Sequence, residues 1–239
     1  MKNIKPLNGK AYGSIPHLIG SKVGEGDHTV HDGQHRICTE KTRDKHDLVI
    51  VQEKYDGSNV CIARINGTLV PLVRAGYTAA SSPRIQHHYF DRWVKRSTHL
   101  FEFLEEGERL CGEWLLQAHG IKYSIFAEPF VAFDIMRGSE RAPYAEFSQR
   151  AKDLVLPLPV HIGGSISIEY AMEKLSANKG GWVKANGDKP EGIIYRVERQ
   201  GKVDFLAKFV RPDFVTGKYL ESVSGQSEVW NIEPEWFFA

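Results

Sequence analysis

The segment VIVQEKYDGSNVCIARI, residues 49–65, decides how this chain folds. An apolar run, Val49-Ile50-Val51, precedes an Asp-Gly pair, and an alternating run with Val60, Ile62 and Ile65 follows it, which is the pattern of two antiparallel strands joined by a tight turn. Lys54 lies at the mouth of the turn, and Asp56 follows two residues later. Such a lysine is either an ordinary surface residue of a hairpin or a nucleophile, and the rest of the chain must distinguish the two.

Length and composition are those of an ordinary soluble globular protein. The chain has 239 residues, of which 41% are hydrophobic and 26% charged, and a formal net charge of +1. It is long enough to bury a core of its own, and the charge balance confines any nucleic-acid partner to a local patch. The three cysteines form no C-x-x-C pair and predict a reducing, cytoplasmic setting. No secretory signal and no membrane-spanning apolar run is expected.

The pattern of apolar residues predicts an α+β fold. Helices are expected over 81–107, 142–155 and 167–181, the first capped by Ser82 before Pro83. Strands are expected over 47–55, 59–65, 69–76, 109–116, 129–137, 190–198 and 203–211, the last two as a pair. Because strands and helices do not alternate regularly, we expect no doubly wound parallel sheet.

A resemblance to a known family starts at the turn. The residues EKYDGSN, 53–59, resemble the motif that carries the adenylated lysine in ATP-dependent RNA and DNA ligases and, with GTP, in mRNA capping enzymes. The Ser-Asn pair after the glycine is most similar to nick-sealing RNA ligases. Five more motifs follow in that family's order: LVRAGY with Arg74, RLCGEWL with Glu113, FVAFDIM with Phe133, PEGIIYR with Glu191 and FLAKFVR with Lys208.

The resemblance covers about residues 47–212 and implies a nucleotidyltransferase (adenylation) domain. Its antiparallel sheets would be flanked by helices, with the adenylate pocket between them. We expect one domain over 1–239, with a loop-rich lead-in at 1–46 and a short tail at 213–239. About thirty residues follow Lys208, so we expect no C-terminal OB-fold in this chain. The lead-in or a partner repair protein would then supply the missing hold on RNA.

The resemblance implies roles for the charged residues, which their chemistry supports. Lys54 and Lys208 would be catalytic, with Lys54 carrying AMP. A nearby metal or second cation would lower the Lys54 pKa from its usual value near 10.4 and make the amine nucleophilic. Lys208 and Arg74 would bind the α-phosphate of ATP. Glu191 would hold Mg²⁺ or Mn²⁺, and Asn59 would orient a phosphate or a metal-bound water.

Other residues would contact the nucleoside. Glu113 suits the ribose hydroxyls, Phe133 suits stacking on adenine, and the backbone near Glu53 would read the adenine edge. Taken alone, Phe133 in its apolar run is better explained by core packing. Val131 or Ile135 would point to the same face of a regular strand, so the stacking residue stays open.

The implied activity is an ATP-dependent RNA ligase acting in RNA repair. Its steps would be lysyl-AMP formation, transfer of AMP to an RNA 5′-phosphate, and attack of a 3′-hydroxyl on the adenylated end. A minimal DNA ligase is one alternative, and a capping-type guanylyltransferase is a second, although the missing OB module argues against it. A nucleotide-binding or RNA-end-binding module that does not ligate is another, although a binding module needs no nucleophile.

Two features leave questions open. The family's last motif usually has two lysines separated by one residue, but Leu206 stands at the first position here, and Arg211 is the next cation. Residues 84–99 interleave cations with aromatic residues, which suits a nucleic-acid path through Arg84, Arg92, Lys95 and Arg96. The alternative for this stretch is an amphipathic helix with a solvated basic face.

Overall fold

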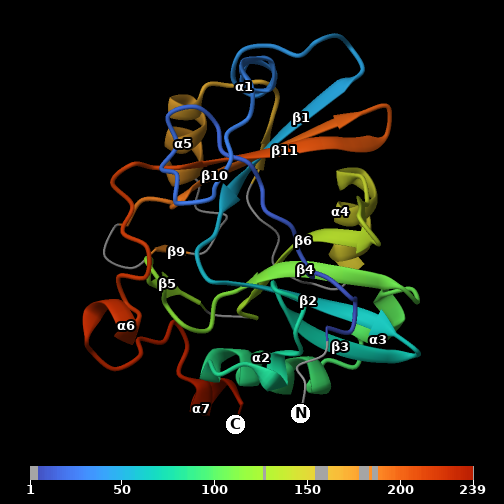
Figure 1. Cartoon of the computed structure of the whole chain (residues 1–239), viewed down its shortest axis with the longest axis vertical. Coiled ribbons are helices and arrows are strands. Elements are labelled where there is room, and N and C mark those ends of the chain that lie inside the picture. The colour runs from blue at the N-terminus through green and yellow to red at the C-terminus, as the bar shows by residue number, and fades with distance from the viewer. Residues whose placement is uncertain (1–4, 126–127, 154–160, 178–182, 185–187, 239) are drawn as a thin grey trace.

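The computed structural model describes residues 5–125, 128–153, 161–177, 183–184 and 188–238. Two antiparallel sheets face each other (Figure 1). The first sheet has the order β11-β10-β1-β8, with β1 Asp47–Lys54, β8 His161–Gly163, β10 Gly192–Arg199 and β11 Lys202–Val210. The second has the order β3-β2-β4-β6-β7, with β2 Ser58–Ile65, β3 Thr68–Val73, β4 Glu108–Trp114, β6 Phe130–Arg137 and β7 Glu140–Arg141. A small ribbon pairs β5 Tyr123–Ser124 with β9 Val183–Lys184.

Helices cover the outer faces of both sheets. The α-helices are α1 Asp32–Thr39, α2 Ile85–Arg96, α3 Leu100–Phe103, α4 Tyr144–Asp153, α5 Ile168–Ala177, α6 Glu221–Ser224 and α7 Pro234–Phe237, and η1 Ala79–Ser81 is a 3₁₀ turn. In Figure 1, α1 and α5 lie with the first sheet, while α2 lies under the second and α3 lies beside β3. The arrangement confirms the predicted α+β fold with antiparallel sheets. None of the described helices is long and apolar enough to cross a membrane.

The first sheet has one apolar and one polar face because successive side chains of a strand point to opposite sides. Val49 and Val51 of β1 pack with Ala171 and Leu175 of α5 in a buried core. The alternate residues face inward, toward the second sheet. In register across the three long strands, these inward rows are Ile50, Arg196 and Leu206, then Gln52, Ile194 and Lys208, then Lys54, Gly192 and Val210.

The second sheet packs its outer face on α2. Phe90 and Trp93 of α2 meet Trp114 of β4 and Phe130 of β6 in the largest aromatic cluster, with ring centroids 5.2–6.0 Å apart. Offset and edge contacts at such distances stabilise a core beyond area burial alone. On the inner face, Cys61 and Cys111 pack with Tyr12 of the lead-in, and the part of this face around Asn59 and Glu113 lines a cavity.

A buried ionic network joins the sheets. Asp134 of β6 is 1% exposed and accepts hydrogen bonds from Arg196 of β10 at 2.5 Å, from the Tyr12 hydroxyl at 2.7 Å and from Arg141 at 3.1 Å. Arg196 also donates to Glu198 at 2.6 Å and to the Ala142 carbonyl oxygen. Every charge is paired, which is the condition for holding ions in an interior. The network fixes the spacing between the inner faces.

The lead-in forms backbone hydrogen bonds with β11, although its residues lie outside the span of the family resemblance. Lys208 N–H donates to Pro16 O at 2.9 Å, Leu18 N–H to Lys208 O at 2.7 Å and Lys22 N–H to Val210 O at 2.8 Å. These bonds satisfy an otherwise open strand edge. The lead-in thereby becomes a wall of the space between the sheets.

Most predicted elements are present, with one helix divided. The prediction of a single helix over 81–107 is wrong, because Ser97 leaves the helical region (φ −91°, ψ 62°) and separates α2 from α3. The predicted cap at Ser82 is also wrong. Arg84 is still extended and forms the N-cap, and Ser82 Oγ accepts from the Arg84 N–H at 3.2 Å. The expected helices over 142–155 and 167–181 are α4 and α5, whose last predicted residues, 154–155 and 178–181, lie outside the described residues.

Candidate active site

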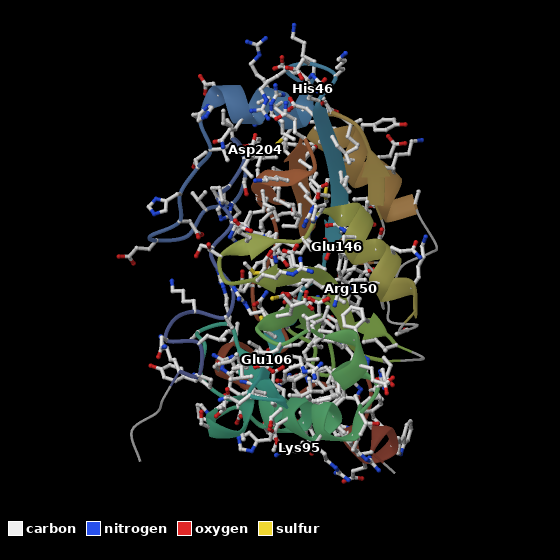
Figure 2. The ribbon with its side chains drawn as sticks, turned by 90° about the vertical axis from the view of Figure 1, so that its right-hand side faces the viewer. His46, Lys95, Glu106, Glu146, Arg150 and Asp204 are labelled. Carbon is white, nitrogen blue, oxygen red and sulfur yellow. The ribbon has the colours of Figure 1, made fainter. Side chains whose placement is uncertain are left out.

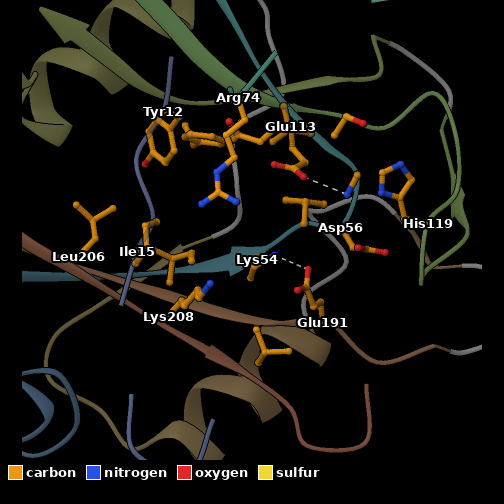
Figure 3. A pocket seen from close by; sticks show the side chains of 18 of the residues that line it. Tyr12, Ile15, Lys54, Asp56, Arg74, Glu113, His119, Glu191, Leu206 and Lys208 are labelled. Atoms are coloured by element: carbon orange, nitrogen blue, oxygen red, sulfur yellow. Dashed lines mark hydrogen bonds and ion pairs between the residues drawn. The ribbon is translucent and has the colours of Figure 1, made fainter. Parts of the chain in front are cut away.

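A cavity of about 710 Å³ lies between the two inner faces (Figure 3). Each predicted catalytic, nucleotide-binding or metal residue lines it: Glu53, Lys54, Asn59, Arg74, Glu113, Phe133, Glu191 and Lys208. They come from β1, β2, β4, β6 and β11 and from residues next to β3 and β10. Positions up to 155 residues apart in the chain are thus brought together in one pocket, as the family resemblance requires.

The turn after Lys54 is fixed by hydrogen bonds between Asp56 and residues 120–123. Asp56 is buried and accepts hydrogen bonds from the N–H groups of Gly120 at 2.5 Å and Ile121 at 2.9 Å, and its own N–H donates to the Tyr123 hydroxyl. Gly57 has no room for a side chain, since a Cβ there would lie 2.5 Å from the Trp114 carbonyl oxygen. Asp56 is therefore an anchor for the turn, and glycine is required next to it.

Lys54 is surrounded by carboxylates. Its Nζ lies 2.5 Å from Glu191 Oε2, and its side chain is 24% exposed. Burial lowers the pKa of Lys54, but the charges of Glu191, Glu113 and Asp56 outweigh burial and leave the pKa raised. The lowered pKa that is expected beside a metal or a second cation stays a prediction, because the raised pKa is that of the protein on its own. The physical reason for the raised pKa is that the nearest charged groups are acids rather than a cation.

The same crowding acts on the acids. Burial raises the pKa of Glu113 to about 8 and that of Glu191 to about 7, with Lys54 opposing both shifts. Glu113 also accepts a hydrogen bond from the Gly57 N–H at 3.1 Å. Two buried acids share one ammonium, so the cluster favours an added positive charge, which a divalent cation with oxygen ligands would provide.

The donor set fits a metal held mainly by its substrate. Within the described residues, no group of three or more His, Cys, Asp or Glu side chains is arranged to hold a metal ion. Mg²⁺ commonly binds through one or two carboxylates together with substrate phosphates and waters. Glu191, at the pocket wall beside Lys54, fits this mode of binding.

A β-bulge decides which residue of β6 faces the nucleotide side. Cys111 pairs with Asp134 and Gly112 with Ala132, so Phe133 is the extra residue. The bulge reverses the alternation: Val131 and Phe133 line the cavity, while Ile135 packs in the core on α2. Of the alternatives, Ile135 is therefore excluded. Phe133 makes an edge contact with Tyr12 at 5.2 Å, which fixes its ring at the cavity wall.

The cations of the last motif have different surroundings. Lys208 lies 3.8 Å from Asp27 Oδ1, and Asp27 Oδ2 lies 3.1 Å from His17 Nε2. Burial lowers the pKa of Lys208, opposed by Asp27. Leu206 is 8% exposed and faces the cavity in the same row as Arg196. Arg211 instead donates to Pro190 O and pairs with Asp213, so it does not take the place of the missing lysine.

Two buried polar groups in the cavity have neither a hydrogen-bond partner nor an ion pair among the described residues. These are Gln52 Nε2, on the same face of β1 as Lys54, and Asn59 Oδ1. Unsatisfied buried amides in a pocket are groups that a polar ligand would satisfy. Gln52 was missed from the sequence. Its polar side chain within the apolar run before Lys54 was the available signal.

The lead-in contributes residues that the motifs did not indicate. Tyr12, His17, Lys22 and Asp27 all line the cavity. Arg74, at the end of β3, donates to Ser14 Oγ at 3.1 Å and so also contacts the lead-in. Only the cluster of polar residues and glycines in the sequence hinted at a functional loop there.

The predicted nucleic-acid stretch divides between two places. Arg84 lines the cavity, at the start of α2. Arg92 stacks on Phe238, Arg96 donates to the Phe238 carbonyl oxygen, and Lys95 pairs with Asp91. Figure 2 shows Lys95 at the end of the molecule opposite His46 and Asp204. Arg92 and Arg96 thus bind the chain's own tail, and an RNA role for these cations stays a prediction.

Comparisons with known proteins bear on the family and the fold of this chain. A family model described as RNA ligase matches residues 47–210. No curated protein sequence matches this chain.

Three solved structures have a similar fold. An archaeal ATP-dependent RNA ligase is 16% identical, with a TM-score of 0.52 over 83% of this chain and 48% of its own. A putative ATP-dependent DNA ligase from Aquifex aeolicus is 16% identical, with a TM-score of 0.50 over 83% of this chain and 49% of its own. A Naegleria gruberi RNA ligase mutant with ATP and Mn is 17% identical, with a TM-score of 0.51 over 88% of this chain and 61% of its own. This chain spans about half to three fifths of their length, and the likeness shows a shared fold.

Proposed function

The chain belongs to the RNA ligase family, and from this membership and its site we propose that it is an ATP-dependent RNA ligase. It would join a 3′-hydroxyl to a 5′-phosphate through lysyl-AMP and an adenylated RNA end, in cytoplasmic RNA repair. The observation that carries the proposal is the placement of Lys54. It lies in one cavity with two acids, Glu191 and Glu113, and two cations, Lys208 and Arg74.

The first step forms the covalent intermediate. The neutral Lys54 amine attacks the α-phosphorus of ATP, an N–P bond forms, and the bond to the β-phosphate oxygen breaks. The electron pair leaves with pyrophosphate, and the protons lost by Lys54 pass to solvent. Lys208 and Arg74 place positive charge where negative charge builds up on the α-phosphate.

The next two steps use the same pocket. An oxygen of the RNA 5′-phosphate attacks the AMP phosphorus, the N–P bond breaks, and Lys54 takes up protons again. The 3′-hydroxyl then attacks the activated 5′-phosphorus, forms the phosphodiester and releases AMP and a proton. Asn59, with its unpartnered Oδ1 just past the turn, is suited to orient the ends.

The nucleoside and the metal also have matching groups. Phe133 offers a ring face, Gln52 offers an amide suited to the adenine edge near Glu53, and Glu113 offers an acceptor for ribose hydroxyls. Glu191 and the phosphates would hold Mg²⁺ or Mn²⁺, which supplies charge neutralisation at the phosphates when bound. The Naegleria gruberi RNA ligase structure contains ATP and Mn, which supports ATP and a divalent metal as the ligands of this pocket.

The test is covalent labelling. AMP-free protein is mixed with ATP labelled at the α-phosphate and Mg²⁺ or Mn²⁺, denatured and examined for bound label, with labelled GTP in parallel. Label is expected with ATP, none with Lys54→Ala, and undiminished label with Lys45→Ala, a change in an exposed loop. Absence of label with both nucleotides would favour the binding module. Labelled protein that seals nicked DNA but not RNA would favour the DNA ligase.

A further inference from the structure

The cations of the cavity are not equally available to a ligand. Among the described residues, six line it: Lys22, Lys54, Arg74, Arg84, Arg196 and Lys208. Lys54 is paired with Glu191, and Arg196 is bound by two acids. Lys208 is near Asp27, at 3.8 Å. Because position 206 is a leucine, the family motifs leave Lys208 and Arg74 to bind the phosphates. These two cations supply less positive charge than the negative charge that a triphosphate carries.

The lead-in places Lys22 beside the reactive end of the first sheet. Lys54 pairs with Gly192, Gly192 pairs with Val210, and the Lys22 N–H donates to Val210 O at 2.8 Å. These four residues therefore form one row across neighbouring strands, with roughly 5 Å between strands. Lys208 lies in the adjacent row. Lys22 is thus at the same end of the sheet as the nucleophile, on the far side of β11.

Lys22 is held without being neutralised. Its Nζ donates to the carbonyl oxygen of Phe214 at 2.5 Å, and within the described residues it forms no ion pair with a carboxylate. The residue is exposed at the cavity rim. A lysine in contact with a neutral acceptor keeps its charge for an anionic ligand, and it can exchange the carbonyl for a phosphate oxygen at small cost.

We propose that Lys22 binds the β- and γ-phosphates of ATP and the pyrophosphate that leaves, and so adds a cation to a last motif that has leucine at position 206. The inference rests on the proposed function and adds a residue outside the span that matches the family model. Charge accumulates on pyrophosphate as its bond to the α-phosphorus breaks, so a cation there favours the first step and its reversal.

This role makes Lys22 specific to one step. Sealing of an RNA strand that already carries a 5′-adenylate involves no pyrophosphate. Loss of Lys22 should therefore slow lysyl-AMP formation and the pyrophosphate-driven return of AMP to ATP, while sealing of pre-adenylated RNA is unchanged. A structural role of Lys22 would affect all three reactions.

The experiment compares Lys22→Ala, Lys22→Gln and Lys22→Arg with Lys10→Ala, an exposed lead-in lysine that does not line the cavity. Lysyl-AMP formation and pyrophosphate-driven AMP release should each fall about 10- to 100-fold in the Ala and Gln variants. The Arg variant should recover most of the rate. The Gln variant keeps a donor for Phe214 without the charge, and thermal melting of each variant shows whether the fold is intact.

Two results would overturn the inference. One is an adenylation rate in Lys22→Gln equal to that of the unchanged protein. The other is an equal loss in adenylation and in sealing of pre-adenylated RNA. Failure of the proposed function gives a different result, because the unchanged protein itself would then take no label from ATP.

Discussion

Lys54 and Glu191 form a 2.5 Å hydrogen-bonded ion pair at the point where β1 ends and β10 begins. The pair means that the resting nucleophile is an ammonium, with its lone pair occupied by a proton. Adenylation must therefore separate the lysine from its acid before the N–P bond forms. The surrounding acids control how readily that happens.

The first prediction concerns the pH dependence of adenylation. Since the Lys54 pKa is raised, the neutral fraction grows as pH rises toward that pKa, and the rate of lysyl-AMP formation should increase from pH 6 to pH 9. Glu191→Gln removes the largest charge that raises the pKa, so its remaining activity should reach its plateau at lower pH. The measurement is the initial rate of protein labelling with α-labelled ATP. A rate that falls over this range would contradict the prediction.

The second prediction concerns the stability cost of Glu113. Its pKa is about 8 in the folded protein, above the usual value near 4.5, so the folded state binds the proton more tightly than the unfolded state. The destabilising effect is absent below about pH 4.5 and grows as pH rises toward 8. Glu113→Gln should thus stabilise the fold at pH 8 by on the order of 1–2 kcal/mol while adenylation declines.

The comparison for Glu113→Gln is thermal melting at pH 5 and pH 8. The melting temperature of Glu113→Gln should exceed that of the unchanged protein at pH 8, and the difference should nearly vanish at pH 5. Glu40→Gln, at an exposed helix end, should change neither melting temperature by more than about 1 °C. An equal gain at both pH values would show that the buried charge is not its source.

The third prediction concerns Asp56. Its Oδ2 accepts from two buried backbone N–H groups, and Asp56→Ala leaves both without a partner. Unsatisfied buried donors cost about 1–3 kcal/mol each, so we expect a loss of roughly 2–4 kcal/mol in the free energy of unfolding. Denaturant unfolding measures this, with Asp91→Ala on α2 as the control for loss of a carboxylate. A loss no larger than the control would mean that the turn is not held by Asp56.

Local pattern was sufficient for much of the fold. The short apolar runs in 49–65, on either side of the Asp-Gly turn, predict β1 and β2 because a buried strand is a short apolar segment bounded by turn residues. The short strands β5, β7, β8 and β9 have two or three residues, too few for any periodicity. The break at Ser97 was not visible either, since the apolar residues on both sides keep helical spacing.

The site was predictable where a motif fixes it and not elsewhere. Lys54 and Glu191 meet because β1 pairs with β10, and Glu113 joins them because β4 pairs with β2, the strand that follows the turn. The motif order anticipated that these residues share one site. The bulge at Phe133 could not be anticipated, because an extra residue changes the register without changing the composition. The lead-in residues are placed by backbone bonds to β11, which leave no periodic signal in the sequence.

The last prediction tests whether Leu206 is a defect or an adaptation. If the fold merely lacks a lysine there, Leu206→Lys should raise adenylation. We expect no gain in adenylation and a less stable fold. Leu206 is 8% exposed and lies in register with Arg196, whose guanidinium is already bound by Asp134 and Glu198. A new ammonium beside it would be buried without an acid of its own, at a cost of about 1–3 kcal/mol.

The expected readout is a melting temperature lower by roughly 2–10 °C with no gain in lysyl-AMP formation. Leu206→Met conserves volume without adding charge, and its melting temperature should stay close to that of the unchanged protein. If Leu206→Lys melts normally and adenylates faster, its side chain reaches the phosphates despite Arg196. The lead-in cation would then be an addition to the family's last motif, and not its replacement.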